Sequence, residues 1–570
     1  MESPFRIVIV GAVACGPKTA SRLRRLMPGA DITVVEKDSL LSYGACGLPY
    51  YVAGEFSNIH ALTHTQVGLP RTSEFFRDTK GFTVLSQTEA LSIDRGDKTL
   101  LIRSLESGEE RRLPYDKLVL ATGGTAFRPP LPGIDLKNVW FMTHPEHARS
   151  LVEEISSRGY KKAIMVGAGF IGVEMTEALI YKDMDVALVE MADQIMPGVM
   201  DKDMAAYAAQ HMDDNDVTLV LGERVVGINA DESGEAAVSV STDKRTVEGD
   251  CVIVAVGTRP NDKLAREAGL SCTPRGGIIV NSNCRTSDPD IYAGGDCVVN
   301  DYVSRMVSDP LFVPLGSTAN KHGRVIANHI AGRPTPFRGI NGTGVVKCFD
   351  FTIGRTGMTE AMARQQGIDY EAITWGGPDM PHYMKDARYF LIKILADRKN
   401  RRLLGVQVAG AGQGAKRLDV AAATLYYGGT IDELAELDLA YAPPFAPPLD
   451  PIAVAAHILV NKMEGLARSI SVVEARARMD AGDVVLLDVR EPDENKMVKM
   501  PYDDIIHIPL GELRSRMDEL PRDKDILTFC KISLRGYEAQ LILNAGGYDR
   551  VWFIEGGHEA WPYGLDYLGM

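Results

Sequence analysis

The sequence predicts an α/β fold that contains an internal duplication. Two segments share one pattern: an apolar strand ends in a glycine-rich turn, a helix follows, and a second strand closes on an acidic residue. The first segment runs from Phe5 to Glu36 and the second from Ala163 to Glu190. A chain of 570 residues is also too long for one hydrophobic core, and about 150 residues per domain suggest roughly four domains. We therefore expect two Rossmann-like nucleotide-binding domains and further α/β units.

The second glycine-rich turn, from Gly167 to Gly172, has all three glycines of the dinucleotide-binding pattern. Such glycines allow a tight turn, a close approach of the backbone to a pyrophosphate, and close packing of helix on strand. Glu190 lies where a carboxylate would bond the ribose 2′-hydroxyl. The residues that follow, Met191 to Gln194, include no arginine to receive a 2′-phosphate. We therefore expect NADH to be preferred over NADPH.

The first glycine-rich turn departs from this pattern. Val13 takes the place of the second glycine, and Cys15 precedes the third, Gly16. A strand–helix–strand unit that has lost its ligand is one alternative. Glu36 and the later Asp296 argue against it, because an aspartate that follows two glycines at a strand end is well placed to bond a polyol chain. Two paired dinucleotide units imply one bound flavin and one exchangeable nicotinamide.

Composition and charge narrow the classes of partner. The net charge of −14 argues against nucleic acid, because a phosphate backbone favours a basic surface. We find no apolar run of about 18 residues that would predict a membrane helix, and no signal-peptide pattern. The eight cysteines have neither disulfide nor zinc-site spacing. We therefore expect a cytoplasmic protein without a metal site.

The glycine fingerprints stop after about Gly339. From there to Met463, strands such as Tyr389 to Leu395 precede helices, which predicts an α+β domain. The proline-rich stretch from Ala442 to Pro448 predicts a rigid extended segment. A last unit begins near Ala467 and alternates strands with a helix, which predicts a small α/β domain.

Three short segments make a family resemblance specific. They are Ala121-Thr122-Gly123, Tyr292-Ala293-Gly294-Gly295-Asp296 and Ser42-Tyr43-Gly44-Ala45-Cys46-Gly47-Leu48-Pro49-Tyr50. With the two nucleotide units they resemble the FAD-dependent pyridine nucleotide-disulfide oxidoreductases, over roughly residues 5 to 463. The cysteine segment is similar to that of the single-cysteine branch, which includes coenzyme A-disulfide reductases, NADH oxidases and peroxidases, and NADH-dependent persulfide reductases. The resemblance implies bound FAD and a homodimer in which the partner completes each active site.

Cys46 is the main candidate for redox chemistry, because the resemblance implies that this sulfur lies next to the flavin. No second cysteine follows it until Cys251, so it cannot close an internal disulfide with a neighbour. It must then cycle through a mixed disulfide, a persulfide or a sulfenic acid. A buried apolar cysteine is the alternative. Cys15 is a weaker candidate for a partner, because it would lie by the flavin pyrophosphate.

The resemblance also implies a set of binding residues. Those assigned to FAD or NADH are Gly11, Gly16, Glu36, Lys37, Thr122, Gly123, Arg128, Asp296, Gly167, Gly169, Phe170, Ile171, Gly172, Glu174, Glu190 and Gly257. Those assigned to coenzyme A are Arg22, Arg25 and Ser42. The two arginines are three residues apart, so they share one face of the predicted helix. Surface arginines without a ligand are the alternative, and Ala45 replaces an asparagine of the relatives' pocket.

Two tyrosines match residues that the relatives bring to the partner subunit's active site. Tyr441 matches well, whereas the residues around Tyr383 depart from the relatives' pattern. We therefore expect both in catalytic positions, with Tyr441 the better supported.

The final unit, from about residue 467 to 570, resembles rhodanese domains. Cys530 lies between a predicted strand and the start of a helix, where backbone N–H groups and the helix dipole stabilise a thiolate or persulfide. Lys531 and Arg535 add positive charge, and Arg535 is expected to contact the substrate. Ser533 stands where many relatives have glycine, and an inactive rhodanese-like binding module is the alternative.

These observations predict four domains and one main function. The FAD-binding domain covers 1–150 and 275–338, the NAD-binding domain 151–274, the dimerisation domain 339–463, and the rhodanese-like domain 467–570. We expect NADH-dependent reduction of coenzyme A persulfide, polysulfide or related sulfane sulfur at Cys46, with Cys530 as sulfur carrier. A coenzyme A-disulfide reductase and an NADH oxidase or peroxidase are the nearest alternatives. A sulfurtransferase and a flavin redox sensor are alternatives of other classes.

Overall fold

The computed structural model describes residues 4–303, 310–482 and 484–567. The predicted domain ends at residues 1 and 570 lie outside these ranges. The described chain forms two compact units, and its α/β architecture agrees with the sequence prediction. The first unit contains residues 1–167, 178–186 and 225–340, and the second contains 168–177, 187–224 and 341–570. No described helix is both long and apolar enough to cross a membrane.

The first nucleotide-binding sheet is parallel and lies in the first unit. Its strand order is β18-β7-β1-β2-β3. The strands are β1 (Arg6–Val10), β2 (Asp31–Val35), β3 (Thr83–Leu85), β7 (Lys117–Leu120) and β18 (Ile291–Ala293). Ile7 and Ile9 pack into one hydrophobic cluster, and Val8 and Val10 into another. The apolar run of β1 therefore buries both faces, as parallel strands do.

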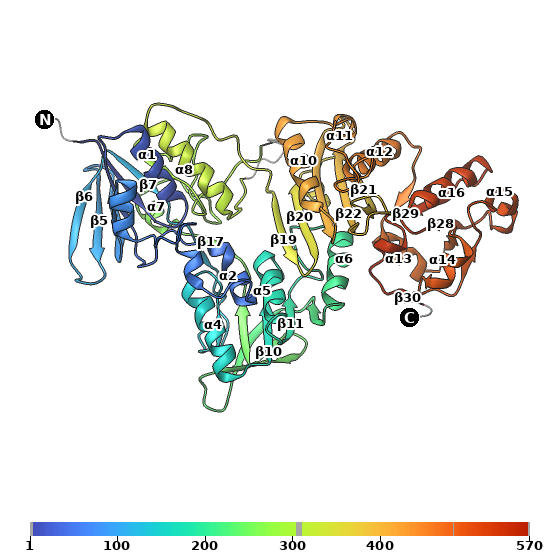
Figure 1. The fold of residues 1–570 in the computed structure, drawn as a ribbon, viewed down its shortest axis with the longest axis horizontal. Helices are drawn as coiled ribbons and strands as arrows, with labels where there is room; N and C mark the ends of the chain where they lie inside the picture. The colour runs from blue at the N-terminus through green and yellow to red at the C-terminus, as the bar shows by residue number, and fades with distance from the viewer. Residues whose placement is uncertain (1–3, 304–309, 483, 568–570) are drawn as a thin grey trace. The chain divides into compact units, whose positions relative to one another are not determined.

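Two helices cover one face of this sheet, α1 (Cys15–Leu26) and α8 (Gly316–Ile330). They pack against each other and lie side by side in Figure 1. Helix α1 is the helix expected after the first glycine-rich turn. An antiparallel sheet of β4 (Thr88–Asp94), β5 (Thr99–Ser104) and β6 (Glu110–Pro114) belongs to the same unit.

The second nucleotide-binding sheet repeats this design. Its strand order is β12-β11-β10-β16-β9. The strands are β9 (Val139–Trp140), β10 (Lys162–Val166), β11 (Asp185–Glu190), β12 (Val217–Leu221) and β16 (Cys251–Val254). The helix after the second glycine-rich turn is α5 (Phe170–Ile180), and a later helix is α6 (Lys202–Asp213). The predicted duplication is therefore present in the structure.

The second unit contains an antiparallel sheet in the order β19-β20-β23-β22-β21. The strands are β19 (Gly344–Cys348), β20 (Phe351–Gly357), β21 (Tyr370–Pro378), β22 (Tyr389–Asp397) and β23 (Leu403–Gly410). The helices are α9 (Glu360–Gln365), α10 (Gly414–Tyr427), α11 (Ile431–Ala435) and α12 (Pro451–Met463). This combination confirms the predicted α+β character of the segment.

The proline-rich stretch differs from its prediction. The backbone N–H groups of Phe445 and Ala446 both donate to the Ala442 carbonyl, at 2.8 and 3.1 Å. The stretch therefore begins with a tight turn, and the expectation of a rigid extended segment is wrong here. A proline ring fixes φ near −65°, which suits a helical turn as well as an extended chain.

The last α/β layer is a parallel sheet in the order β24-β29-β28-β25-β27. The strands are β24 (Ser469–Ile470), β25 (Val484–Asp488), β27 (Ile505–His507), β28 (Asp525–Phe529) and β29 (Val551–Ile554). Its main helices are α13 (Val472–Asp480) and α16 (Leu534–Ala545). Phe553 of β29 shares a hydrophobic cluster with Phe390 and Ile392 of β22. This layer therefore packs against the antiparallel sheet within the second unit.

Candidate functional site

The first glycine-rich turn has room only for glycine at both of its ends. A Cβ atom at Gly11 would lie 2.1 Å from the Ala121 carbonyl oxygen, and one at Gly16 would lie 1.9 Å from the Gly11 carbonyl oxygen. Glu36 is buried, and its carboxylate accepts hydrogen bonds from the backbone N–H groups of Ala12 at 2.7 Å and Asp38 at 3.0 Å. The turn is therefore fully formed although Val13 replaces its middle glycine.

The second turn is built in the same way. Gly167 has φ of +99°, and a Cβ atom there would lie 2.6 Å from the Ala255 carbonyl oxygen. A Cβ atom at Gly169 would meet nothing within 4 Å, so this backbone is open to a ligand. The Glu190 carboxylate accepts hydrogen bonds from the N–H groups of Ala168 and Ala192, each at 2.9 Å. Glu36 and Glu190 thus play equivalent structural roles, because each carboxylate accepts hydrogen bonds from backbone N–H groups of its own nucleotide-binding unit.

The remaining predicted nucleotide residues follow these turns. Phe170, Ile171, Gly172 and Glu174 all lie on the first turns of α5. Lys37 is exposed directly after Glu36. Arg128, which was assigned to cofactor binding, makes contacts within the protein. Its guanidinium pairs with Asp135 at 2.7 Å and lies 4.4 Å from the centre of the Phe141 ring.

A clamp that the sequence analysis missed holds the Thr122–Gly123 turn. The Thr122 hydroxyl donates to the Asn261 carbonyl at 2.6 Å, and the Asn261 amide donates to the Thr122 carbonyl at 2.8 Å. The Asn261 N–H also donates to the Gly123 carbonyl at 2.9 Å. Gly257, with φ of +111°, begins the segment that leads to Asn261. In the sequence, only the apolar run from Val252 to Val256 and the turn residues after it point to this segment.

The turn that carries Asp296 is fixed by a neutral histidine. The Gly295 N–H donates to Nδ1 of His322 at 3.1 Å, and burial lowers the pKa of His322 to about 4. The imidazole is therefore an uncharged acceptor at neutral pH. Asp296 is half-buried, and burial raises the pKa of its carboxyl. A desolvated carboxyl at this strand end suits the hydroxyl groups of a polyol chain.

The Cys46 segment is tied to the first glycine-rich turn. The Ser42 N–H donates to the Ala12 carbonyl at 2.8 Å. The Arg71 guanidinium donates to the Ser42 carbonyl at 2.8 Å and to the Leu62 carbonyl at 3.3 Å. Cys46 itself lies in a short 3-10 helix, Ala45–Gly47, just before α2 (Leu48–Ala53). Arg71, which the sequence analysis did not single out, is therefore a positioning residue for this segment.

Cys46 also differs from the other cysteines in exposure. All eight lie in the described part of the chain, none of them in a disulfide bond, and Cys46 alone is exposed. Cys15 is buried, and burial raises its pKa well above the usual value. Burial raises the pKa of Cys251 and Cys284 to about 12. The alternative of Cys46 as a buried apolar residue is wrong, and the burial of Cys15 makes it a poor redox partner.

Four arginines gather where α1 packs on α8. Arg22 and Arg25 lie on α1, Arg324 lies on α8, and Arg333 follows α8. Burial and the neighbouring charges of Arg324, Arg25 and Arg333 lower the pKa of Arg22. The Arg22 guanidinium also donates to Asn328 Oδ1 at 3.0 Å. We call these four residues the arginine cluster; like charges gathered in this way favour a bound polyanion.

The second candidate cysteine, Cys530, lies between β28 and α16 as predicted and is 1 % exposed. Its carbonyl accepts a hydrogen bond from the His558 N–H at 3.0 Å. Ser533 has φ of +86°, a conformation that glycine adopts readily and other residues rarely, which explains why glycine suits this position. Arg535 pairs with Glu494 through two contacts of 2.6 and 2.7 Å, so its charge is partly offset. The predicted contact of Arg535 with substrate stays a prediction.

The two tyrosines assigned to the partner's site are both on the surface of the second unit. Tyr441 is 53 % exposed and Tyr383 is 65 % exposed. Both side chains are therefore accessible to another subunit.

Comparison with known protein families gives matches to three successive stretches of the chain. The family described as "Pyridine nucleotide-disulphide oxidoreductase" matches residues 5–319, and its dimerisation domain matches residues 344–450. The rhodanese-like domain family matches residues 471–562. These matches agree with the predicted fold class.

Individual relatives are similar to this chain in sequence over most of its length. It is 32% identical to the NAD(P)H sulfur oxidoreductase (CoA-dependent) of Pyrococcus furiosus over 80% of this chain and 99% of that protein. It is 30% identical to the coenzyme A disulfide reductase of Staphylococcus haemolyticus over 78% of this chain and 97% of that protein. Among solved structures, the NAD-dependent persulfide reductase from A. fulgidus matches with a TM-score of 0.92 and 40% identity, covering 98% of this chain and 100% of that one. The chain therefore belongs to the pyridine nucleotide-disulphide oxidoreductase family and carries a rhodanese-like domain over residues 471–562.

Proposed function

We propose that this chain is an NADH-dependent, FAD-containing reductase of coenzyme A persulfide, polysulfide or related sulfane sulfur, with Cys46 as its redox-active sulfur. The observation that carries the proposal is the placement of the one exposed cysteine on a segment bonded to the first nucleotide turn. The rhodanese-like domain with Cys530 in the same chain favours sulfane-sulfur chemistry. Relatives with persulfide reductase or CoA-dependent sulfur oxidoreductase in their names support the same substrate class.

The nucleotide sites fit the cofactors of the family. Gly11 and Gly16 leave no room for a side chain, which is what a close backbone approach to the FAD pyrophosphate needs. Asp296 would bond the ribityl chain, and Glu36 would face the ribose. The open backbone at Gly169 and the carboxylate of Glu190 suit NADH. Bound FAD supplies a two-electron carrier between NADH and sulfur.

Cys46 performs the sulfur chemistry in this proposal. Its thiolate attacks the outer sulfur of coenzyme A persulfide, the S–S bond breaks, and coenzyme A leaves as a thiolate. Cys46 then holds the transferred sulfur as a persulfide. Two electrons that originate from NADH break this second S–S bond, release hydrosulfide and restore the Cys46 thiolate. Arg71 holds the backbone of the segment during these steps through the Ser42 carbonyl.

One comparison tests the proposal against its nearest rivals. We expect anaerobic NADH oxidation to be fastest with coenzyme A persulfide or polysulfide, slower with coenzyme A disulfide, and slowest with peroxide. Faster turnover of coenzyme A disulfide than of every sulfane-sulfur substrate would instead identify a coenzyme A-disulfide reductase. Preference for oxygen or peroxide would identify an oxidase or peroxidase.

The proposed assembly is a cytoplasmic homodimer that acts on small molecules. The match to the family's dimerisation domain over residues 344–450 supports a homodimer. Exposed Tyr441 and Tyr383 are proposed to enter the partner subunit's active site. The eight cysteines, all described and none in a disulfide bond, support a reducing compartment.

The arginine cluster predicts how coenzyme A is anchored. We expect Arg25→Ala to raise the KM for coenzyme A persulfide about tenfold, because a lost ionic hydrogen bond to phosphate costs about 1.5 kcal/mol. The KM for inorganic polysulfide should stay the same, since polysulfide lacks the nucleotide. Steady-state NADH oxidation with each substrate measures both values.

Arg24→Ala is the matched control, because Arg24 lies on the same helix and donates to the Pro28 carbonyl at 2.6 Å. It should leave both KM values near those of the unmodified enzyme. An Arg25→Ala variant with equal losses for both substrates would show that the cluster does not bind the nucleotide.

The Glu190 carboxylate predicts cofactor preference. We expect kcat/KM for NADH to exceed that for NADPH by about tenfold or more, because the 2′-phosphate would approach a carboxylate without a compensating arginine. Glu190→Gln should lower the ratio of kcat/KM for NADH to kcat/KM for NADPH. Asp193→Asn is the control and should leave this ratio unchanged, because the Asp193 carboxylate pairs with Lys202 at 2.6 Å. An equal or higher kcat/KM with NADPH in the unmodified enzyme would contradict this prediction.

A further inference from the structure

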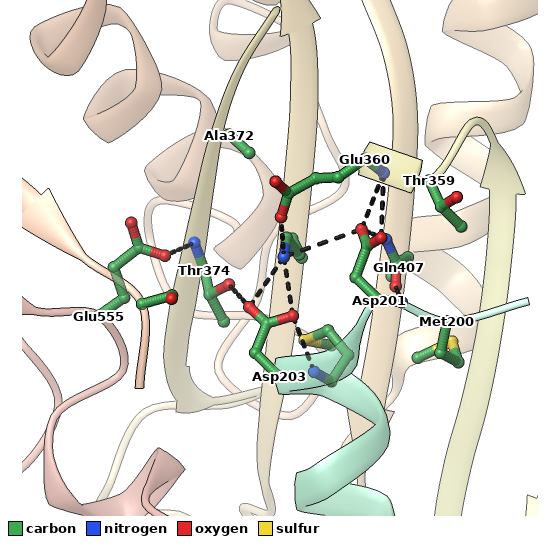
Figure 2. A network of polar contacts seen from close by, with 12 residues as sticks. Met200, Asp201, Asp203, Thr359, Glu360, Ala372, Thr374, Gln407 and Glu555 are labelled. Carbon is green, nitrogen blue, oxygen red and sulfur yellow. Dashed lines mark hydrogen bonds and ion pairs between the residues drawn. The ribbon is translucent and has the colours of Figure 1, made fainter. Parts of the chain in front are cut away.

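A buried glutamate joins the rhodanese-like domain to the antiparallel sheet. Glu555 follows β29 and is 4 % exposed. Its carboxylate accepts hydrogen bonds from the Thr374 N–H at 2.9 Å, the Ser469 hydroxyl at 2.6 Å and the Lys462 ammonium at 3.1 Å. Figure 2 shows the contact between Glu555 and Thr374 of β21. Three donors from three segments therefore fix one side chain.

A tyrosine of the antiparallel sheet reaches the next residue of the same turn. The Tyr389 hydroxyl donates to the Gly556 carbonyl at 3.3 Å. A Cβ atom at Gly376 would lie 2.0 Å from this hydroxyl oxygen, so only glycine leaves room for the phenol there. Burial, followed by the charges of Tyr207, Glu559 and Cys530, raises the pKa of Tyr389 well above its usual value. The phenol therefore stays protonated and can only be neutral at this contact.

The turn that these residues hold also supports the Cys530 loop. The N–H groups of His558 and Glu559 donate to the carbonyls of Cys530 at 3.0 Å and Lys531 at 3.2 Å. A Cβ atom at Gly557 would lie 2.5 Å from each of these two carbonyl oxygens. The two backbone segments are thus in direct contact, so a shift of the turn must move the Cys530 loop.

The sheet side of this junction is itself held by a buried charge network. The Thr374 hydroxyl donates to Asp203 at 3.1 Å, and Lys393 pairs with Asp203 at 2.7 Å and Glu360 at 2.5 Å. The Lys393 ammonium lies within ion-pair distance of the carboxylates of Asp203, Glu360 and Asp201, and Figure 2 shows these three carboxylates facing one another. Thr374 of β21 is therefore held by its hydroxyl group, which bonds Asp203, and by its N–H group, which bonds Glu555. Glu555 thus has a partner whose position is fixed.

We propose that the antiparallel sheet holds the Cys530 loop in the conformation that accepts sulfur, and that Glu555 and Tyr389 are the positioning residues for Cys530. This inference rests on the proposed role of Cys530 as sulfur carrier. Cys530 would accept sulfur when its thiolate attacks the outer sulfur of a donor such as thiosulfate, the donor S–S bond breaks, and sulfite leaves. The backbone N–H groups around the sulfur must be aligned for this step, and the 555–558 turn sets that alignment.

Glu555→Gln and Tyr389→Phe in the full chain test the proposal. Each variant keeps nearly the same volume, and Lys462 retains Glu371 at 3.3 Å, so no buried lysine is left without a carboxylate. We expect the rate constant for loading Cys530 from thiosulfate, followed by mass spectrometry, to fall at least tenfold in each variant, with little change in the KM for thiosulfate. NADH oxidation with coenzyme A disulfide should keep its normal rate, because that reaction does not use Cys530.

Tyr427→Phe is the control, because Tyr427 lies on α10 of the same unit and is 82 % exposed. It should load Cys530 at the normal rate. Normal loading in both Glu555→Gln and Tyr389→Phe would overturn the proposal. An equal loss of disulfide reduction would also count against it, since these residues would then support the whole unit. Failure of the unmodified chain to load Cys530 would instead refute the carrier role itself.

Discussion

Replacing Cys46 by serine is expected to abolish NADH-dependent reduction of sulfane sulfur while FAD stays bound and reducible by NADH. A serine hydroxyl is nearly the same size but does not attack a sulfane sulfur or hold it in a reducible bond. Turnover should therefore fall by about a thousandfold or more, as when other nucleophiles are removed. Steady-state NADH oxidation measures the loss, and anaerobic bleaching of the flavin absorbance by NADH shows that the first half of the cycle survives.

The residues that hold the cofactor explain why this separation is expected. The turn contacts of Glu36 and the Asn261 clamp at Thr122 involve no atom of Cys46. Cys272→Ser is a matched control, because Cys272 is half-buried and burial raises its thiol pKa. That variant should reduce persulfide normally. A Cys46→Ser enzyme with normal persulfide turnover would mean that another cysteine carries out the chemistry.

The nucleotide-binding part of the fold could be predicted because its determinants are local in sequence. Apolar runs such as that of β1 mark buried parallel strands. Glycines at the turns are needed where a side chain would collide with backbone of the same strand–helix–strand unit. Gly16, for example, contacts the carbonyl of Gly11, only five positions earlier. The acidic residue that closes each unit then meets the N–H groups of its own turn. Periodicity and spacing therefore carry most of this information.

The contacts that complete the site are long-range, and no pattern in the sequence marks them. Arg71 reaches Ser42 across 29 positions, and Asn261 reaches Thr122 across 139. Thr374 and Glu555 are 181 positions apart. Each pair joins ordinary polar residues whose partners depend on how distant segments pack. A single sequence marks Cys46 and Cys530 as candidates for sulfur chemistry but does not show which residues hold their loops in place.

The backbone conformation of Ser533 is another feature that the sequence alone could not predict. Its position before a helix predicted a loop, and the family pattern suggested glycine there. The structure shows the reason, since φ of +86° lies in a region that costs an ordinary residue about 1–3 kcal/mol. The loop that contains Ser533 is supported by the turn after Glu555, whose N–H groups bond the Cys530 and Lys531 carbonyls.

The second large effect is expected from Cys530→Ser, measured in two regimes. The variant should reduce preformed coenzyme A persulfide at the normal rate, because that substrate needs only Cys46. It should lose most activity when the reaction starts from a sulfur donor and free coenzyme A, because Cys530 would no longer form the persulfide that coenzyme A collects. NADH oxidation under both regimes gives the two rates.

The reason for expecting a mobile carrier lies in how Cys530 is held. It is 1 % exposed, and its loop is supported by a turn that Glu555 and Tyr389 bind to the antiparallel sheet. A loop fixed in this way is poorly suited to travel to another cysteine, whereas the long thiol-ended arm of coenzyme A would move while the arginine cluster, in the proposed binding mode, retained its nucleotide. Tethering would also keep the local concentration of the carried sulfur high. Cys46→Ser should fail in both regimes, which would place the two cysteines in order. Unchanged rates of Cys530→Ser in both regimes would show that Cys530 takes no part in reductase turnover.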